Sequence, residues 1–152
     1  MSEKQCAGAV LGLANQIRRK FNMITDKNAT QTHILYFLFH DGACRKIYQK
    51  DIEEALNIKS ASLSVQLKKM EKSNMIARRK VSGDDRLKEV CPAPAGIALK
   101  EQINDEINLL EDILTEGICK KDLDTFYDVV RKMSENISSN EKNYVHRGGG
   151  KQ

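Results

Sequence analysis

Apolar side chains recur at the three- and four-residue spacing of an α-helix over much of the chain, so a mainly helical protein is predicted. The first stripe predicts an N-terminal helix and comprises Val10, Ala14, Ile17, Phe21 and Ile24. A second stripe follows Pro94 and comprises Ile103, Ile107, Leu110 and Leu114. A third lies beyond Gly117, which we expect to separate the last two helices, and comprises Leu123, Phe126, Tyr127, Val130, Met133 and Ile137.

Two shorter helices are predicted in the middle of the chain, joined by a tight turn. Residues 48–56 form an amphipathic pattern with Ile52, Ala55 and Leu56 on one face, and Asn57 suits a helix end because asparagine tolerates a left-handed backbone. Residues 60–73 repeat the pattern, with a stripe that we expect to be buried, formed by Leu63, Leu67 and Met70. This arrangement predicts a helix-turn-helix.

The outer face of the second short helix carries small or basic side chains, namely Ala61, Ser62, Ser64, Val65, Lys68, Lys69 and Lys72. Small side chains would let the helix approach base edges in a major groove, while lysines would meet phosphates. An ordinary solvated face would have the same composition. The helix alone does not decide between these interpretations.

A basic hairpin is predicted directly after this helix. Residues 76–81 suit one strand, residues 82–85 a turn and residues 87–91 a returning strand that ends at Pro92. Five basic residues in the hairpin outnumber its acidic ones: Arg78, Arg79, Lys80, Arg86 and Lys88. A basic hairpin beside a helix-turn-helix is typical of a wing, which can place an arginine in the minor groove of DNA.

These segments together resemble the MarR family of bacterial regulators. The residues that carry the resemblance are 52–58, Leu63 with Leu67, 70–72 with 75–76, and Asp84-Asp85-Arg86 with Gly96 ten positions after the arginine. The resemblance implies that Asp84 orients Arg86 and that Arg86 enters the minor groove. It also implies a dimeric transcriptional regulator, here a repressor released by a small ligand.

Two departures from the family pattern concern helix starts. Pro92-Ala93 stands where Leu-Thr is usual, and Pro94 compensates as a first-turn proline. Lys59 occupies the usual cap of the recognition helix, which leaves Ser60 as the nearest residue able to cap it. The residues predicted to meet DNA are Ser60, Ala61, Ser62, Ser64, Val65, Lys68, Lys69, Arg78, Lys80, Asp84 and Arg86.

The predicted fold class is therefore mainly α with a small β-hairpin wing, in one domain over residues 1–140. The winged helix-turn-helix covers about 30–92, dimerisation helices cover about 2–25 and 94–138, and residues 141–152 are expected to be a disordered tail. Purely intramolecular packing of the terminal helices is the alternative. The resemblance favours a two-fold homodimer on double-stranded DNA, reading half-sites of a pseudo-palindromic operator about 34 Å apart.

Composition changes this picture little. The chain has 152 residues, 40% of them hydrophobic, which suffices for one domain with a core. A net charge of +4 would not identify a nucleic-acid binder, so the clustering of basic residues carries that inference. No apolar run approaches the length of a membrane helix and no basic leader precedes the apolar start, so a cytoplasmic protein with four reduced cysteines is expected.

Candidate chemistry is sparse. The three histidines do not stand at metal-ligand spacing with a cysteine pair, and catalytic motifs are missing, so we expect neither an enzyme nor a cofactor or metal. His40-Asp41 near Cys44 is the weak metal alternative. Cys119 precedes two lysines at a helix start, and Cys6 lies where the organic-peroxide-sensing branch of the family has its sensor, so a redox-sensing regulator is one alternative.

The other alternative is a winged-helix module that binds a protein instead of DNA. If the chain instead answers to a small molecule, the resemblance places that effector between the dimerisation helices and the winged domain. The residues expected to border this cleft are Ile17, Phe21, His33, Tyr36 and Phe37. The sequence does not identify the effector.

Overall fold

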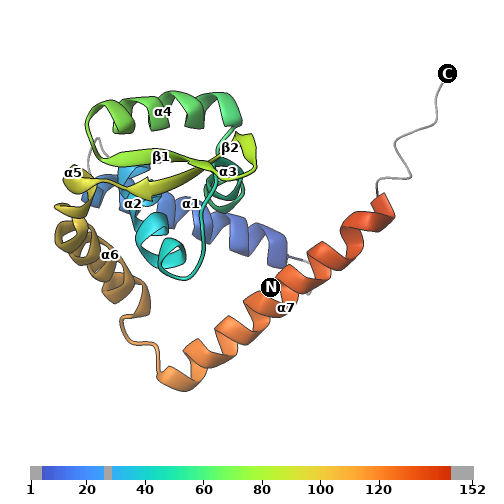
Figure 1. Cartoon of the computed structure of the whole chain (residues 1–152). Coiled ribbons are helices and arrows are strands. Elements are labelled where there is room, and N and C mark those ends of the chain that lie inside the picture. Colours follow the sequence, from blue (N-terminus) through green and yellow to red (C-terminus); the bar gives the residue numbers. More distant parts are fainter. Residues whose placement is uncertain (1–4, 26–28, 145–152) are drawn as a thin grey trace. The chain divides into compact units, whose positions relative to one another are not determined.

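The structure, a computed structural model, describes residues 5–25 and 29–144, without the side chains of residues 85, 86 and 141–144. The chain divides into two compact units, residues 1–111 and 112–152, which we treat separately (Figure 1). The fold is mainly helical with a two-stranded antiparallel hairpin, which confirms the predicted fold class. Within the described ranges, no helix has both the length and the apolar character needed to span a membrane.

The first unit opens with helices α1 (Cys6–Thr25) and α2 (Ala29–His40), followed by the 3-10 turn η2 (Asp41–Ala43). Helix α2 is the hydrophobic centre of the unit, because Ile34, Leu35 and Leu38 are almost completely buried. The stripe predicted in α1 is divided: Phe21 is buried, whereas Val10 at the other end of the helix is half exposed. Much of the apolar surface of α1 is therefore left uncovered by this unit.

Helices α3 (Gln49–Leu56) and α4 (Ser60–Lys72) form the predicted helix-turn-helix. Asn57 adopts the expected left-handed conformation, with φ 50° and ψ 48°, and the predicted stripe of Leu63, Leu67 and Met70 is fully buried. The cap prediction for Ser60 is wrong. Lys59 is the N-cap because its extended backbone carbonyl accepts the Leu63 N–H at 3.0 Å, and its side chain makes no capping hydrogen bond.

Strands β1 (Ile76–Val81) and β2 (Asp84–Pro92) pair antiparallel, with Ile76 opposite Pro92 and Lys80 opposite Lys88. The turn is shorter than predicted: it contains only Ser82 and Gly83, and β2 begins three residues earlier than expected. A glycine with φ +96° permits this tight reversal, and a register shift between Lys80 and Val81 absorbs the difference. Figure 1 shows the hairpin between α4 and α2.

The base of the hairpin is joined to the segment before α3. The Val90 N–H donates to the Ile47 carbonyl at 2.8 Å, and Tyr48 forms an isolated bridge with Glu89. Asp51 then accepts the Tyr48 N–H at 2.7 Å and pairs with Arg45 at 3.0 Å, which secures the first turn of α3. The hairpin and the helix-turn-helix are therefore one connected structure.

The segment predicted as one long helix after Pro94 is broken. Helix α5 (Pro94–Ile97) is a single turn with Pro94 in its first turn, and α6 (Lys100–Thr115) follows. The break places Gly96 against the backbone of Met75 and the side chain of Leu35. Ile103, Ile107 and Leu110 of α6 are buried in the same unit, as predicted from their spacing.

The second unit consists of the end of α6, a turn and helix α7 (Lys120–Tyr144). Gly117 has φ +74° and separates the two helices, as predicted. Helix α7 extends to residue 144 and so includes the first four residues of the predicted tail, whereas residues 145–152 lie outside the described residues. Near this end of α7 the Asn140 side-chain amide donates to the Asn136 carbonyl one turn earlier, at 2.8 Å.

Candidate nucleic-acid interface

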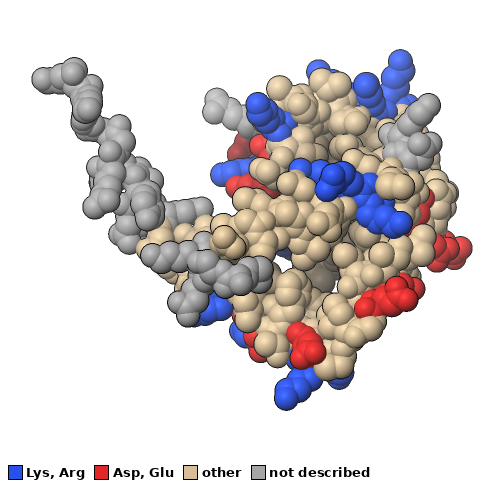
Figure 2. Space-filling view, turned by 180° about the vertical axis from the view of Figure 1, so that it is seen from behind, with Lys and Arg blue, Asp and Glu red and all other residues tan. Residues whose placement is uncertain are grey.

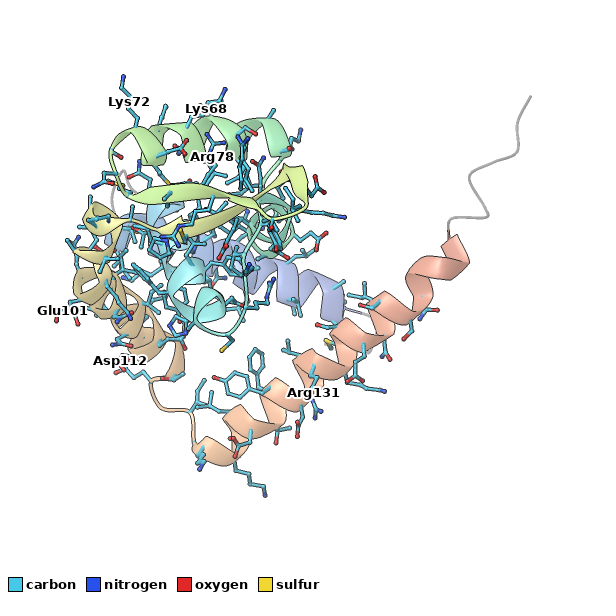
Figure 3. The ribbon with its side chains drawn as sticks, viewed as in Figure 1. Lys68, Lys72, Arg78, Glu101, Asp112 and Arg131 are labelled. Atoms are coloured by element: carbon cyan, nitrogen blue, oxygen red, sulfur yellow. The ribbon has the colours of Figure 1, made fainter. Side chains whose placement is uncertain are left out.

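The outer face of α4 is exposed along its whole length. Ala61, Ser62, Lys68, Lys69 and Lys72 are all exposed, and Val65 at the centre of the face retains 54% of its accessible surface. Lys68 and Lys72 point away from the body of the first unit (Figure 3). Basic side chains also protrude along the top of the space-filling view in Figure 2, at the level of α4. The side chains of this face are small at the start of α4 and basic towards its end.

Ser60, the first residue of α4, is also exposed, whereas Ser64 is half-buried. The Ser64 hydroxyl accepts a hydrogen bond from Gln49 Nε2 at 2.9 Å, and the same nitrogen donates to Glu53 Oε1 at 3.0 Å. Sequence reasoning missed Gln49 and Glu53. Their four-residue spacing on α3 is visible in the sequence, but the crossing of α3 over α4 decides that Ser64 is their partner.

Arg78 belongs to β1, and its side chain forms an ion pair with Glu71 of α4. Figure 3 labels Arg78 beside α4. The Nε and Nη2 atoms of Arg78 donate to Glu71 Oε2 at 3.0 and 2.5 Å, and only 20% of the arginine side chain is exposed. The hydrogen bond from Arg78 lowers the pKa of Glu71, despite a smaller opposing effect of burial. Arg78 therefore connects the wing to α4, in addition to any contact that it makes with DNA.

This pair yields a prediction that separates positioning from direct contact. Glu71→Gln removes the charge that holds Arg78. If Arg78 acts by connecting β1 to α4, the substitution should weaken DNA binding about two- to fivefold, because a partly exposed ion pair contributes no more than about 1 kcal/mol. If Arg78 contacts phosphate directly, releasing it should strengthen binding. Electrophoretic mobility shifts with Glu71→Gln and Arg78→Ala distinguish the two results.

The hairpin places more basic side chains beside α4. Exposed Lys80 stands opposite exposed Lys88 in the register, so this part of the hairpin is basic on both strands. Asp84 is the exposed first residue of β2, and Arg86 follows in the same strand. The backbone therefore places the Asp84 and Arg86 pair at the tip of the wing, next to the turn.

A cavity of about 630 Å³ lies within the first unit, between α1, the start of α2 and the end of α3. Three of the five predicted effector residues line it, namely Ile17, Phe21 and His33. Tyr36 and Phe37 do not border this cavity; both are half-buried further along α2, where Tyr36 packs on the His40 ring at 4.2 Å.

The polar wall of this cavity was not predicted. Arg18, Asn22 and Asn57 contribute it, and the His33 ring stacks on Phe21 with a centroid distance of 3.8 Å. Burial, and secondly the charge of Arg18, lower the pKa of His33, so this imidazole is neutral at pH 7. The cavity therefore combines an aromatic wall with one cationic and several neutral polar groups.

The cysteines are all free thiols. The two predicted redox candidates are exposed: Cys6 is the first residue of α1, and Cys119 lies directly before α7. Cys44 is exposed as well, and the Cys91 thiol is half-buried and donates to the Ala77 carbonyl at 3.6 Å. A redox-sensing cysteine must be exposed, but exposure by itself does not distinguish a sensor from an unreactive surface cysteine.

Comparison with known proteins agrees with this geometry. The family model described as "MarR family" matches residues 27–88, which include α2, the helix-turn-helix and most of the wing. The winged helix-turn-helix segment thus matches the MarR family of transcriptional regulators. A relative in Bacillus subtilis (strain 168), described as the uncharacterized HTH-type transcriptional regulator YdgJ, is 25% identical over 130 residues, or 86% of this chain and 77% of YdgJ.

Solved MarR-family structures share the fold. A putative MarR family regulator from Listeria monocytogenes, complexed with 26mer DNA, superposes with a TM-score of 0.75 at 17% identity, over 100% of this chain and 99% of that one. MepR of S. aureus in its DNA-binding conformation gives a TM-score of 0.74 at 20% identity, over 86% and 97% of the two chains. YdgJ and the Listeria monocytogenes protein are both described as transcriptional regulators.

Proposed function

We propose that this chain binds double-stranded DNA through α4 and the wing, as a homodimeric repressor that a small ligand releases. The observation that carries the proposal is the two-sided character of α4. Its inner stripe is fully buried, which holds the helix rigidly, while its outer face is exposed, small and basic. The structures of a relative with DNA support the same use of this fold.

In this proposal the outer face of α4 enters the major groove. Ser60, Ala61, Ser62, Ser64 and Val65 approach base edges, whereas Lys68 and Lys69 meet phosphates. The wing follows the backbone, with Lys80 at a phosphate and Asp84 orienting Arg86 towards the minor groove. Because the centre of α4 offers serines and a valine, much of the sequence preference would come from DNA shape and from half-site spacing.

A salt titration tests DNA binding against the alternative of a protein-interaction module. Binding to promoter DNA flanking the chain's own gene is measured by fluorescence anisotropy from 50 to 200 mM salt. Contacts with several phosphates release counterions, so affinity should fall by about 10³-fold over this range if six phosphates are neutralised. A chain that shows no salt-sensitive binding to this DNA or to DNA selected from a random pool does not function as proposed.

The homodimer is proposed because apolar surface remains uncovered on both terminal helices. On α7 the side chains of Phe126, Tyr127 and Val130 are all at least 39% exposed, and Ile137 is 66% exposed. On α1 the side chains of Val10, Leu11 and Leu13 are similarly exposed. Apolar stripes of this length are buried in stable proteins, and a second copy of the chain would cover both.

Ile137→Glu should therefore weaken the dimer by at least about tenfold, because a carboxylate would have to be buried in an apolar interface. Sedimentation equilibrium measures the mass of the parent and of the variant over a range of concentrations. Ser139→Glu is the matched control, since it adds the same charge on the opposite side of α7. A parent chain that sediments as a monomer would support intramolecular packing instead.

The effector site is proposed in the cavity lined by Ile17, Phe21 and His33. Its volume of about 630 Å³ suits a small organic molecule. A ligand can release DNA only if it binds more tightly to a conformation with the wrong spacing of the two recognition helices. Selective binding to the folded chain also raises its melting temperature, which allows a search without a known ligand.

A melting screen with phenolic ligands, metal ions and oxidants should therefore include a variant with a smaller cavity. Ile17→Trp is expected to reduce the ligand-induced rise in melting temperature, because the indole occupies part of the cavity. Met23→Trp is the control, since Met23 lies on the same helix, is exposed and does not line the cavity. An equal response of both variants would place the ligand elsewhere.

A further inference from the structure

One hydrogen-bonded chain connects the first turn of α3 with the flank of α4. Gln49 Nε2 donates to Glu53 Oε1 at 3.0 Å within α3 and to Ser64 Oγ at 2.9 Å across to α4. Both contacts are partly buried, and both amide protons of Gln49 are used. Neither Gln49 nor Glu53 belongs to the DNA-facing set proposed above.

The direction of these hydrogen bonds follows from chemistry. An ionised carboxylate can only accept, so the amide atom facing Glu53 must be the nitrogen of Gln49. The same nitrogen faces Ser64, so the Ser64 oxygen must accept. An amide can usually be turned around without changing its shape, but Glu53 excludes the reversed orientation here.

The hydroxyl proton of Ser64 is thereby left to donate. Several other helical hydroxyls donate backwards within their own helix: for example, Thr125 donates to the Lys121 carbonyl at 2.9 Å and Ser134 to the Val130 carbonyl at 3.1 Å. Among the described residues, Ser64 makes no such bond. It is only half-buried, and it lies one residue from exposed Val65 at the centre of the outer face.

We propose that Gln49, oriented by Glu53, is a positioning residue that presets the Ser64 hydroxyl as a hydrogen-bond donor towards an acceptor on DNA, either a phosphate oxygen or an acceptor atom of a base. The inference rests on the proposed DNA-binding function. A hydroxyl whose acceptor side is occupied before DNA arrives has fewer orientations to lose on binding, so the contact forms at a lower entropic cost.

A double-mutant cycle tests this proposal. Gln49→Glu keeps the length of the side chain but replaces its donor by a carboxylate, which can donate neither to Glu53 nor to Ser64 and instead competes with DNA for the Ser64 proton. Ser64→Ala removes the hydroxyl. We expect each single variant to weaken DNA binding by about five- to tenfold, the value of one hydrogen bond, and the double variant to bind within about twofold of Ser64→Ala.

The double-mutant cycle also separates the proposed role from the effect of the added charge in Gln49→Glu. If that charge only repelled phosphate, it would weaken DNA binding equally with serine or with alanine at position 64. Gln49→Met provides a neutral version that removes the donor. It should weaken the parent about two- to threefold and leave Ser64→Ala unchanged. The proposal would be overturned if the loss of affinity in a double variant equalled the product of the losses in its two single variants. It would also be overturned if Ser64→Ala bound DNA with the affinity of the parent.

Two further measurements make the outcome specific. Thermal unfolding of each variant shows whether the fold is retained, since a purely structural role of Gln49 would lower the melting temperature without coupling to Ser64 in DNA binding. The second measurement compares the affinities of the parent and of Ser64→Ala for DNA sites substituted at each base pair. If the variant loses discrimination at one base pair of each half-site, the acceptor is a base atom. If it loses affinity equally for all sequences, the acceptor is a phosphate oxygen. If the parent binds no DNA the proposed function fails, whereas multiplicative losses in a parent that binds contradict only the role of Gln49.

Discussion

Replacing Val65 by glutamate is expected to weaken DNA binding by about two orders of magnitude while leaving the fold intact. Val65 lies at the centre of the outer face of α4 and is 54% exposed, so its side chain contributes little to the core. A carboxylate there would be desolvated against base edges and phosphates, and juxtaposed like charges cost several kcal/mol at an interface. The effect should exceed that of any single lysine on the same face.

Fluorescence anisotropy at a fixed salt concentration measures this loss, and thermal unfolding reports the fold. Asn108→Glu is the matched control, because Asn108 is an exposed residue of α6 and the substitution adds the same charge away from α4. The control should bind DNA within about twofold of the parent, since distant exposed charges are largely screened by salt. Similar binding by Val65→Glu would remove the outer face of α4 from the interface.

Replacing Gly96 by alanine should destabilise the protein by about 3 kcal/mol, at the upper end of the usual range for overpacking. A Cβ atom at this position would overlap the carbonyl oxygen of Met75 and would lie 2.9 Å from a methyl group of Leu35. The Met75 carbonyl cannot move freely, because it accepts the Ala93 N–H at 2.9 Å where β2 leads into α5. The backbone must therefore shift, and α5 would separate from the start of β1.

Urea-induced unfolding followed by circular dichroism measures this free energy. Gly42→Ala is the control, because a Cβ there meets only a side-chain carbon of Ile47 at an ordinary 3.6 Å. We expect the control to change the free energy of unfolding by less than about 1 kcal/mol. Equal effects of the two substitutions would show that the close approach at Gly96 is relieved at little cost.

The two predictions concern separate requirements of the proposed function. Val65 tests the surface that meets DNA, whereas Gly96 tests the junction that carries the wing and the helix-turn-helix on α5 and α6. Arg78 and Gln49 serve neither requirement alone, because each connects α4, which carries the DNA-facing surface, to a neighbouring element through a hydrogen bond. A recognition helix that is held from both sides can keep its outer face in one orientation.

Helices α4 and α6 could be predicted from spacing, because each buries one apolar stripe in the core of the first unit. Leu63, Leu67 and Met70 are the plainest case, since three apolar residues at helical spacing point in one direction whatever they pack against. The positions of Asn57 and Gly117 were equally readable. Both have positive φ, and each stands where a helix must end.

The sequence by itself thus determined the helix-turn-helix followed by a hairpin, the buried faces of α4 and α6, and the basic character of α4 and the wing. Only the tertiary structure decided what the polar side chains do: Arg78 binds Glu71, Gln49 donates to Ser64, and His33 stacks on Phe21 beside a cavity. The reason is physical. Apolar periodicity is a local property of a helix, whereas a hydrogen bond between elements depends on the angle and distance at which they cross.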